Sequence, residues 1–254
     1  MTIFIFGFGQ VSKELAKKLS NECYAYQADY SQPFYLNRST ELVNQLKSYE
    51  PSHLQSLMGI SEKLSILNWE RFQSWEPSFN SGNSRQAFFT FRGDTYSGLD
   101  ADTLSSQDLS FSQNHTRILS GLYGVLKPLD LIMPYRLEMG TKIENSAGKN
   151  LYEFWGDALA SDLEKDLAGH ESKYLVNCAS VEYFKSIDKD ALKGKVITPV
   201  FKEVKNGKAR IVSFFAKRAR GMMARYIIQN QINNPNEIKQ FDPVSYTHLT
   251  LPTK

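Results

Sequence analysis

The pattern of apolar and polar positions predicts short strands and short helices that alternate along the chain. Apolar runs typical of buried strands lie at 3–6, 86–91 and 173–178. Helical spacing of apolar residues predicts helices over 39–46, 51–57 and 216–229. The dipeptide Asn206-Gly207 separates two further apolar runs, 196–204 and 209–215, and predicts a β-hairpin. Alternating elements of both kinds indicate a mixed α/β (α+β) fold.

A turn after the helix predicted over 51–57 has features of its own. That helix should end at Leu57 or Met58, and Gly59 permits a left-handed turn. Ser61 can then cap a second helix, with Lys63 in its first turn. The pattern resembles a helix-hairpin-helix, in which the turn presents backbone N–H groups to a phosphate. An ordinary helical hairpin inside the core has the same pattern, so both interpretations stay open.

The first thirty residues resemble the opening of a dinucleotide-binding unit. A short strand is followed by Gly7-Phe8-Gly9 and a helical pattern, and Asp29 lies where a ribose-binding acid is expected. The third glycine of that motif is replaced by Ser12, however, and no regular strand–helix alternation follows residue 31. A structural turn or a grafted fragment is the favoured alternative. A nicotinamide-dependent reductase would need a parallel sheet that continues past residue 30.

The segment 85–160 combines glycine with tyrosine, arginine and carboxylates. Glycine allows close approach of the backbone, and arginine recognises phosphate or carboxylate through several hydrogen bonds. The candidate polar cleft consists of Arg92, Asp94, Tyr123, Tyr135, Arg136, Glu138 and Glu153. A structural polar network is the alternative. The sequence offers no nucleophile–base pattern and no metal-ligand spacing, so these residues do not specify a reaction.

The segment from Lys195 to Arg225 is locally basic. From Lys195 to Arg225 there are nine lysines or arginines and one acid, Glu203, although the net charge of the whole chain is only +3. The predicted helix 216–229 places four cations on one face, namely Lys217, Arg218, Arg220 and Arg225. Such a face is either solvated or binds the phosphates of DNA.

Composition narrows the class of protein. The chain has 254 residues, of which 41% are hydrophobic and 22% charged, as in ordinary globular proteins. Its two cysteines cannot form a disulfide framework, and Cys178, at the end of an apolar run, is expected to be an unreactive buried thiol. No apolar run is long enough to span a bilayer, and no signal peptide opens the chain. We therefore expect a cytoplasmic protein with no membrane contact, no bound metal and no cofactor.

Several long motifs follow one another along the chain, namely LMGISEKLSILNWERF, FRGDTYSGL, LSGLYGVLKPLD, PYRLEMG, LYEFWGD, NCASVEYFK, FKEVKNGK and FFAKRARGMMARYII. These motifs and their order resemble the YaaA family of peroxide-stress proteins. The resemblance covers about residues 31–242. It implies a single mixed α/β domain and a cytosolic role in limiting unincorporated iron and DNA damage during peroxide stress. It also implies double-stranded DNA binding through a helix-hairpin-helix and a basic cleft, and it does not establish any enzymatic activity.

Both ends depart from that family. The chain has GFGQVSKELAKKL where the family has a Ser-Pro-Ala-Lys-Thr-Leu motif, and residues 244–254 do not continue the family's strand-forming end. We therefore expect one domain over 1–243 with an atypical start, and we leave 244–254 out of it. Gly59, Ser61 and Lys63 join the basic helix as candidate DNA contacts. An enzyme acting on a phosphorylated or nucleotide-like substrate in the polar cleft is the second hypothesis, and the reductase is the third. The oligomeric state is left open.

Overall fold

A five-stranded sheet lies at the centre of the computed structural model, which describes residues 2–7, 30–205, 208–242 and 248–250. The strand order is β4-β3-β1-β6-β7. The strands are β1 (Thr2–Gly7), β3 (Thr116–Ser120), β4 (Gly124–Leu126), β6 (Tyr174–Asn177) and β7 (Lys195–Ile197). All neighbours are parallel except β3 and β4, which are antiparallel. The predicted α/β class with a mixed sheet is confirmed.

The first strand occupies the middle of this sheet. Phe4 is in register with Thr116 of β3, and Thr2 with Tyr174 of β6, so both neighbours come from distant parts of the chain. The parallel sheet thus continues past residue 30, as a reductase would require. Neither neighbour of β1 belongs to an adjacent strand–helix unit, however. Residues 8–29, which include Gly9, Ser12 and Asp29, lie outside the described part of the chain, so the dinucleotide turn stays a prediction.

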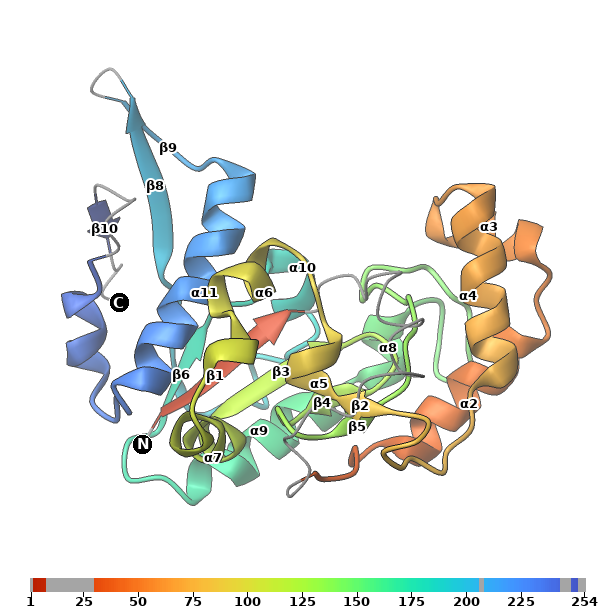
Figure 1. Cartoon of the computed structure of the whole chain (residues 1–254), viewed down its shortest axis with the longest axis horizontal. Coiled ribbons are helices and arrows are strands. Elements are labelled where there is room, and N and C mark those ends of the chain that lie inside the picture. Colours follow the sequence, from red (N-terminus) through yellow and green to blue (C-terminus); the bar gives the residue numbers. More distant parts are fainter. Residues whose placement is uncertain (1, 8–29, 206–207, 243–247, 251–254) are drawn as a thin grey trace.

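Helices cover the sheet on both sides. Helices α7 (Ser106–His115) and α9 (Ala158–Ala168) contact β1, and α10 (Val181–Phe184) contacts β3. Helix α11 (Ser213–Gln229) packs mainly against α6 (Asp94–Leu99). In Figure 1, α9 lies below the strands, whereas α6, α10 and α11 lie above them. No described helix is long and apolar enough to cross a bilayer.

Two projections extend from the ends of the molecule (Figure 1). One consists of α2 (Leu36–Lys47), α3 (Pro51–Met58) and α4 (Glu62–Ser74). The other contains an antiparallel sheet of β8 (Val200–Lys205), β9 (Lys208–Arg210) and β10 (His248–Thr250), in the order β10-β8-β9. Lys205 pairs with Lys208, which confirms the predicted hairpin. The apolar pattern did not predict β10, which pairs residues 248–250 of the tail with β8.

The strand predicted over 86–91 is wrong. Only β2 (Arg85–Gln86) forms a strand there, which pairs with β5 (Leu131–Ile132), and the chain then forms the short helix α5 (Ala87–Thr90). Residues 87–91 are all buried, and a fully buried helix turn has the same unbroken apolar pattern as a buried strand. The remaining elements are η1 (Ala101–Thr103), α8 (Leu151–Trp155) and η2 (Pro235–Gln240).

Candidate nucleic-acid interface

The turn between α3 and α4 has the left-handed backbone that the sequence predicts. Gly59 has φ 59° and ψ 44°, and its N–H donates to the carbonyl of Gln55. The N–H of Ile60 donates to the same carbonyl at 3.2 Å, so the turn closes the end of α3. Ser61 is the N-cap of α4, with an extended backbone, but its side chain makes no capping hydrogen bond. The helix start was therefore predicted correctly, although the hydroxyl does not stabilise it.

This turn is open to a ligand. Ser61, Glu62 and Lys63 are all exposed, and the first backbone N–H groups of a helix have no partner within it. A Cβ atom built on Gly59 would meet nothing within 4 Å, so the backbone is accessible there. The turn thus presents donors, the positive end of the α4 dipole and the Lys63 cation, with the carboxylate of Glu62 as the one opposing charge.

Packing and hydrogen bonds at its base hold this projection in place. Leu54 of α3 and Phe72 of α4 are fully buried. The Nζ of Lys47, in α2, donates to the carbonyl of Trp75 at 2.9 Å, and the Nε2 of Gln73 donates to the carbonyl of Lys47 at 2.9 Å. The exposed turn is consequently carried on a fixed support rather than on a loop.

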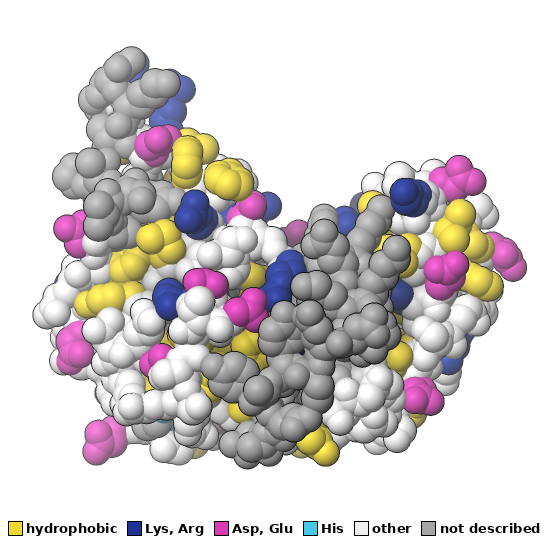
Figure 2. Space-filling view, viewed as in Figure 1, with side chains coloured by type: hydrophobic (Ala, Val, Ile, Leu, Met, Phe, Trp, Pro, Cys, Tyr) yellow, Lys and Arg dark blue, Asp and Glu magenta, His cyan; other side chains and the backbone are white. Residues whose placement is uncertain are grey.

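The opposite projection carries exposed cations. Four of them lie on β9 and the amino-terminal half of α11, namely Lys208, Arg210, Lys217 and Arg218. None of the four side chains forms a hydrogen bond or ion pair with a described residue. Figure 2 shows that the surface is hollowed between this projection and the α3–α4 turn, with lysine and arginine side chains on both sides. We call Lys208, Arg210, Lys217 and Arg218 the basic arm.

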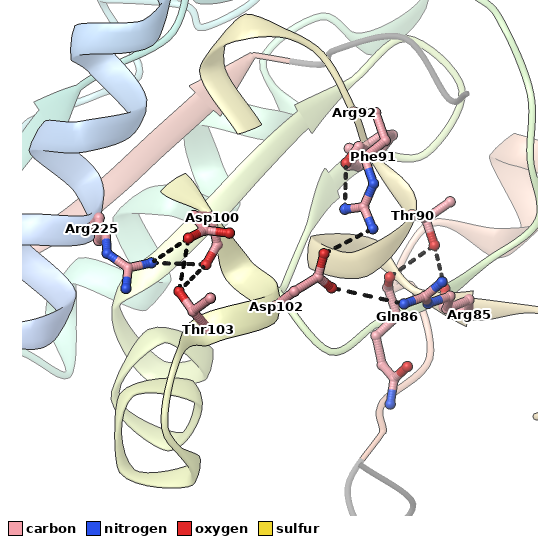
Figure 3. A network of polar contacts seen from close by, with 9 residues as sticks. All are labelled: Arg85, Gln86, Thr90, Phe91, Arg92, Asp100, Asp102, Thr103 and Arg225. Carbon is pink, nitrogen blue, oxygen red and sulfur yellow. Dashed lines mark hydrogen bonds and ion pairs between the residues drawn. The ribbon is translucent and has the colours of Figure 1, made fainter. Parts of the chain in front are cut away.

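Two of the cations predicted for the same helix face are only partly exposed. The Nη1 of Arg225 donates to the carbonyls of Leu99 and Asp100 at 2.9 and 2.8 Å (Figure 3). Arg220 is partly buried beside Cys178, and burial lowers the pKa of its guanidinium. The prediction of one continuous basic face is therefore wrong for Arg225, whose guanidinium is used to join α11 to the end of α6.

The physical reason is a close helix contact in the middle of that face. A Cβ atom on Gly221 would collide with the carbonyl oxygen of Thr95, and one on Gly98 would collide with the carbonyl oxygen of Arg218. Helix α6 therefore lies directly on α11 between the arginines. A glycine inside a predicted helix was the available sequence signal, because a buried glycine lets two backbones approach closely.

The seven residues of the predicted polar cleft fall into separate groups. Arg92 pairs with Asp102 at 3.1 Å, and Asp102 also lies 4.0 Å from Arg85 (Figure 3). Asp94 stands in the first turn of α6. Arg136 pairs with Glu138 at 2.7 Å, and the buried Nε of Arg136 has no hydrogen-bond partner among the described residues. No hydrogen bond or ion pair joins Arg92 or Asp94 to Arg136 or Glu138 within the described residues.

The other three members of the predicted cleft have structural partners. Glu153 accepts hydrogen bonds from the N–H of Lys149 at 2.8 Å and the Nδ2 of Asn150 at 2.6 Å, at the start of α8. The Oη of Tyr123 accepts a hydrogen bond from the Nε1 of Trp75 at 2.9 Å, and the Oη of Tyr135 lies 2.5 Å from the Oγ of Ser120. Both tyrosines are fully buried, and burial raises the pKa of each hydroxyl. Their positions favour the structural-network alternative for these three.

Within the described part of the chain, Cys178, His115 and His170 offer little reactive chemistry. Burial raises the pKa of the Cys178 thiol to about 12, so the nucleophilic thiolate is disfavoured. His115 is buried, stacks on Phe111 and lies at 5.3 Å from His170, centroid to centroid. The described residues contain no group of three or more histidine, cysteine, aspartate or glutamate residues placed to hold a metal ion.

Comparison with known proteins places the chain in a family. A family model described as peroxide stress protein YaaA matches residues 12–250, a wider span than the motifs indicate. A UPF0246 protein of Shewanella sp. (strain W3-18-1) is 55% identical over 217 residues, which cover 85% of this chain and 84% of that protein. A UPF0246 protein of Pseudoalteromonas translucida is 52% identical over 217 residues, with the same coverage, and one of Hahella chejuensis is 50% identical over 233 residues, covering 92% and 91%. The chain belongs to the YaaA family of peroxide stress proteins.

Proposed function

We propose that this peroxide stress protein binds double-stranded DNA in the hollow between the α3–α4 turn and the basic arm. The family resemblance further implies a role in limiting unincorporated iron. DNA binding is the part of that role for which the described residues offer a surface, and shielding of DNA is its proposed purpose during peroxide stress.

The basic arm is the observation that carries the proposal. Lys208, Arg210, Lys217 and Arg218 are exposed, and none of them forms an ion pair with a described carboxylate, although Glu203 is the register partner of Arg210 on β8. Unpaired cations gathered on one surface release condensed counterions when they meet a phosphate backbone, which drives binding with little dependence on sequence. The whole chain has a net charge of only +3, so these cations are a local concentration on one surface and not part of a generally positive protein.

The turn across the hollow adds a second kind of phosphate contact. The backbone N–H groups at the start of α4 belong to exposed residues, and Lys63 is one of these residues. A helix amino terminus favours an anion both through its free donors and through its dipole. Contacts from two sides orient a duplex, whereas the arm alone would only attract it.

The test is a binding titration with a fixed duplex at several salt concentrations. Two to four phosphate contacts predict a slope of log K against log salt of about −2 to −4. Replacing Lys217 and Arg218 together by alanine should flatten the slope by roughly two and weaken binding. The matched control replaces Lys165 and Lys173, two exposed lysines outside the arm, and should change neither quantity beyond a small net-charge effect.

Two results would contradict the proposal. One is a double variant of the arm that binds duplex DNA with the affinity and salt slope of the unaltered protein. The other is a control variant that loses as much as the arm variant, because binding would then follow overall charge and not this surface.

A further inference from the structure

The order of the parallel strands creates a crevice at one edge of the central sheet. Counted along the chain, β1, β3, β6 and β7 are its first to fourth parallel strands, and their order across the sheet is second-first-third-fourth. The next strand after β1 thus lies on one side, and the next after β6 on the other. In open α/β sheets, ligands bind outside the carboxyl ends of two neighbouring strands whose connections diverge in this way. A ligand is therefore expected between the carboxyl ends of β1 and β6.

The carboxyl ends of β1 and β6 lie beside each other. Ile5 of β1 is in register with Asn177, the last residue of β6, and α10 begins shortly afterwards at Val181. In Figure 1, the arrow of β1 ends near α10. Asn177 is buried, whereas Ser180, the N-cap of α10, is partly exposed. The edge therefore has a buried base at Asn177 and is open to solvent at Ser180.

Arg220 of α11 brings a positive charge to this edge. Its guanidinium interacts electrostatically with Cys178, the first residue after β6. Arg220 is only partly exposed, and it forms no hydrogen bond or ion pair with any described residue. Partial burial weakens the hydration of a cation, and a partner has to replace the lost water contacts. Because arginine stays protonated in proteins, the partner that suits this charge is an anion.

We propose that the crevice between β1 and β6 binds a small molecule through an oxyanionic group, a phosphate or a carboxylate, which Arg220 holds. A guanidinium donates two parallel hydrogen bonds to either group, and partial burial strengthens them relative to bonds in water. The site is independent of the DNA-binding surface proposed above, because Arg220 is not part of the basic arm. The protein thus has two ligands, a duplex at the hollow and a small molecule at the sheet edge.

A phosphate of DNA is the other source of the same chemistry. Arg220 is more buried than Lys217 and Arg218, and Arg218 lies about 200° away around α11. A stiff duplex meets exposed cations first, whereas a small molecule fits beside the end of a strand. The position of Arg220 therefore favours the small molecule.

The experiment measures the thermal midpoint of the full-length protein in rising concentrations of inorganic phosphate, against sodium chloride of equal ionic strength. A parallel series uses acetate as the carboxylate. Phosphate also stabilises proteins by exclusion from their surface, so the saturable part of the shift is the measure of binding. We expect a saturable shift with at least one anion. Arg220→Gln keeps a polar side chain without the charge and should weaken that binding about 10- to 150-fold, the range for a hydrogen bond to a charged group.

Ser180→Asp tests the position of the site. Aspartate is a favoured N-cap and can keep the hydrogen bond that the Oγ of Ser180 accepts from the N–H of Tyr183, while its charge repels an oxyanion. We expect this variant to lose the saturable shift. Arg218→Gln is the matched control, because it removes a guanidinium from the same helix. It should keep the saturable shift and weaken duplex binding.

Two results would overturn the small-molecule site. One is the lack of a saturable shift with either anion in the unaltered protein, or a shift that Arg220→Gln or Ser180→Asp leaves unchanged. The other is an Arg220→Gln variant that flattens the duplex salt slope and responds to both anions like the unaltered protein, because Arg220 would then hold a DNA phosphate. Loss of duplex binding in the unaltered protein would refute the proposed function alone, since the anion series contains no DNA.

Discussion

Arginines of similar appearance in the sequence have different roles in the folded protein. Arg218 is exposed, whereas Arg225 donates two hydrogen bonds to the carbonyls that end α6. A hydrogen bond from a charged donor contributes more to stability than a neutral one, and a deleted partner leaves the acceptors unsatisfied. Charge alone therefore does not identify the residues that meet DNA.

Replacing Arg225 by alanine should lower the free energy of unfolding by about 1.5–3 kcal/mol. The duplex salt slope should stay unchanged, because this guanidinium is committed to α6. Urea unfolding measures the first quantity and a salt titration the second. Arg218→Ala should give the reverse pattern, and a flattened slope with unchanged stability in Arg225→Ala would contradict the structural role.

Glu62 is the one carboxylate at the α3–α4 turn, so it should oppose a bound phosphate. Glu62→Gln keeps the size of the side chain and removes the charge. We expect it to increase duplex affinity a few-fold at low salt, with the gain shrinking as salt rises. Glu237→Gln, an exposed change in η2, provides the control. A decrease in affinity would show that the turn does not face phosphate.

Two buried groups should give opposing pH dependence of stability. Burial lowers the pKa of His115 to about 4, so the unfolded state binds more protons between about pH 6.5 and 4, and stability falls on acidification. Burial raises the pKa of Asp130 to about 6, so the folded state binds more protons between about pH 6 and 4, and stability rises on acidification.

Removing one of these groups should reveal the effect of the other on the pH dependence of stability. In Asp130→Asn, the free energy of unfolding should fall more steeply between pH 6 and 4 than in the unaltered protein. In His115→Gln, the fall should be smaller or reversed. Urea unfolding at several pH values measures both slopes, and parallel curves for the three proteins would refute the assignment.

At the scale of elements, two glycines are needed for different reasons. Gly221 leaves room for the close contact between α6 and α11, whereas Gly59 allows a left-handed backbone. Gly221→Ala should destabilise the protein by about 3 kcal/mol or more, since its Cβ atom would collide with a backbone oxygen. In Gly59→Ala the new Cβ atom would meet no other atom, so only the left-handed backbone lowers the free energy of unfolding, by about 1–2 kcal/mol. Thermal unfolding of both variants should reproduce this order, and a reversed order would mean that the helices separate easily.

The sequence predicted those elements whose signals are local. The Gly59 turn, the Asn206-Gly207 hairpin and the strand at β6 all follow from a few adjacent residues. Helix α5 was missed because a continuous buried run carries no periodicity. The partners of Arg225 could not be predicted, because they depend on which helix lies against which, a property of the whole fold.

At the scale of the whole molecule, the two projections should contribute independently to DNA binding. They stand on separate elements on opposite sides of the hollow (Figure 2), and distant sites usually act additively. Lys63→Ala and Arg218→Ala should each flatten the salt slope by about one, and the double variant by about two. A double variant no weaker than either single variant would mean that both residues act on one phosphate.

The central place of β1 also has a consequence for synthesis on the ribosome. Its two neighbours, β3 and β6, are made long after it, so the first strand emerges with no partner available. Contacts between distant parts of a chain slow folding, and an unpaired strand is open to aggregation while it waits. The nascent chain should therefore depend on chaperones until β6 has left the ribosome, and a fragment that stops before residue 174 should not fold.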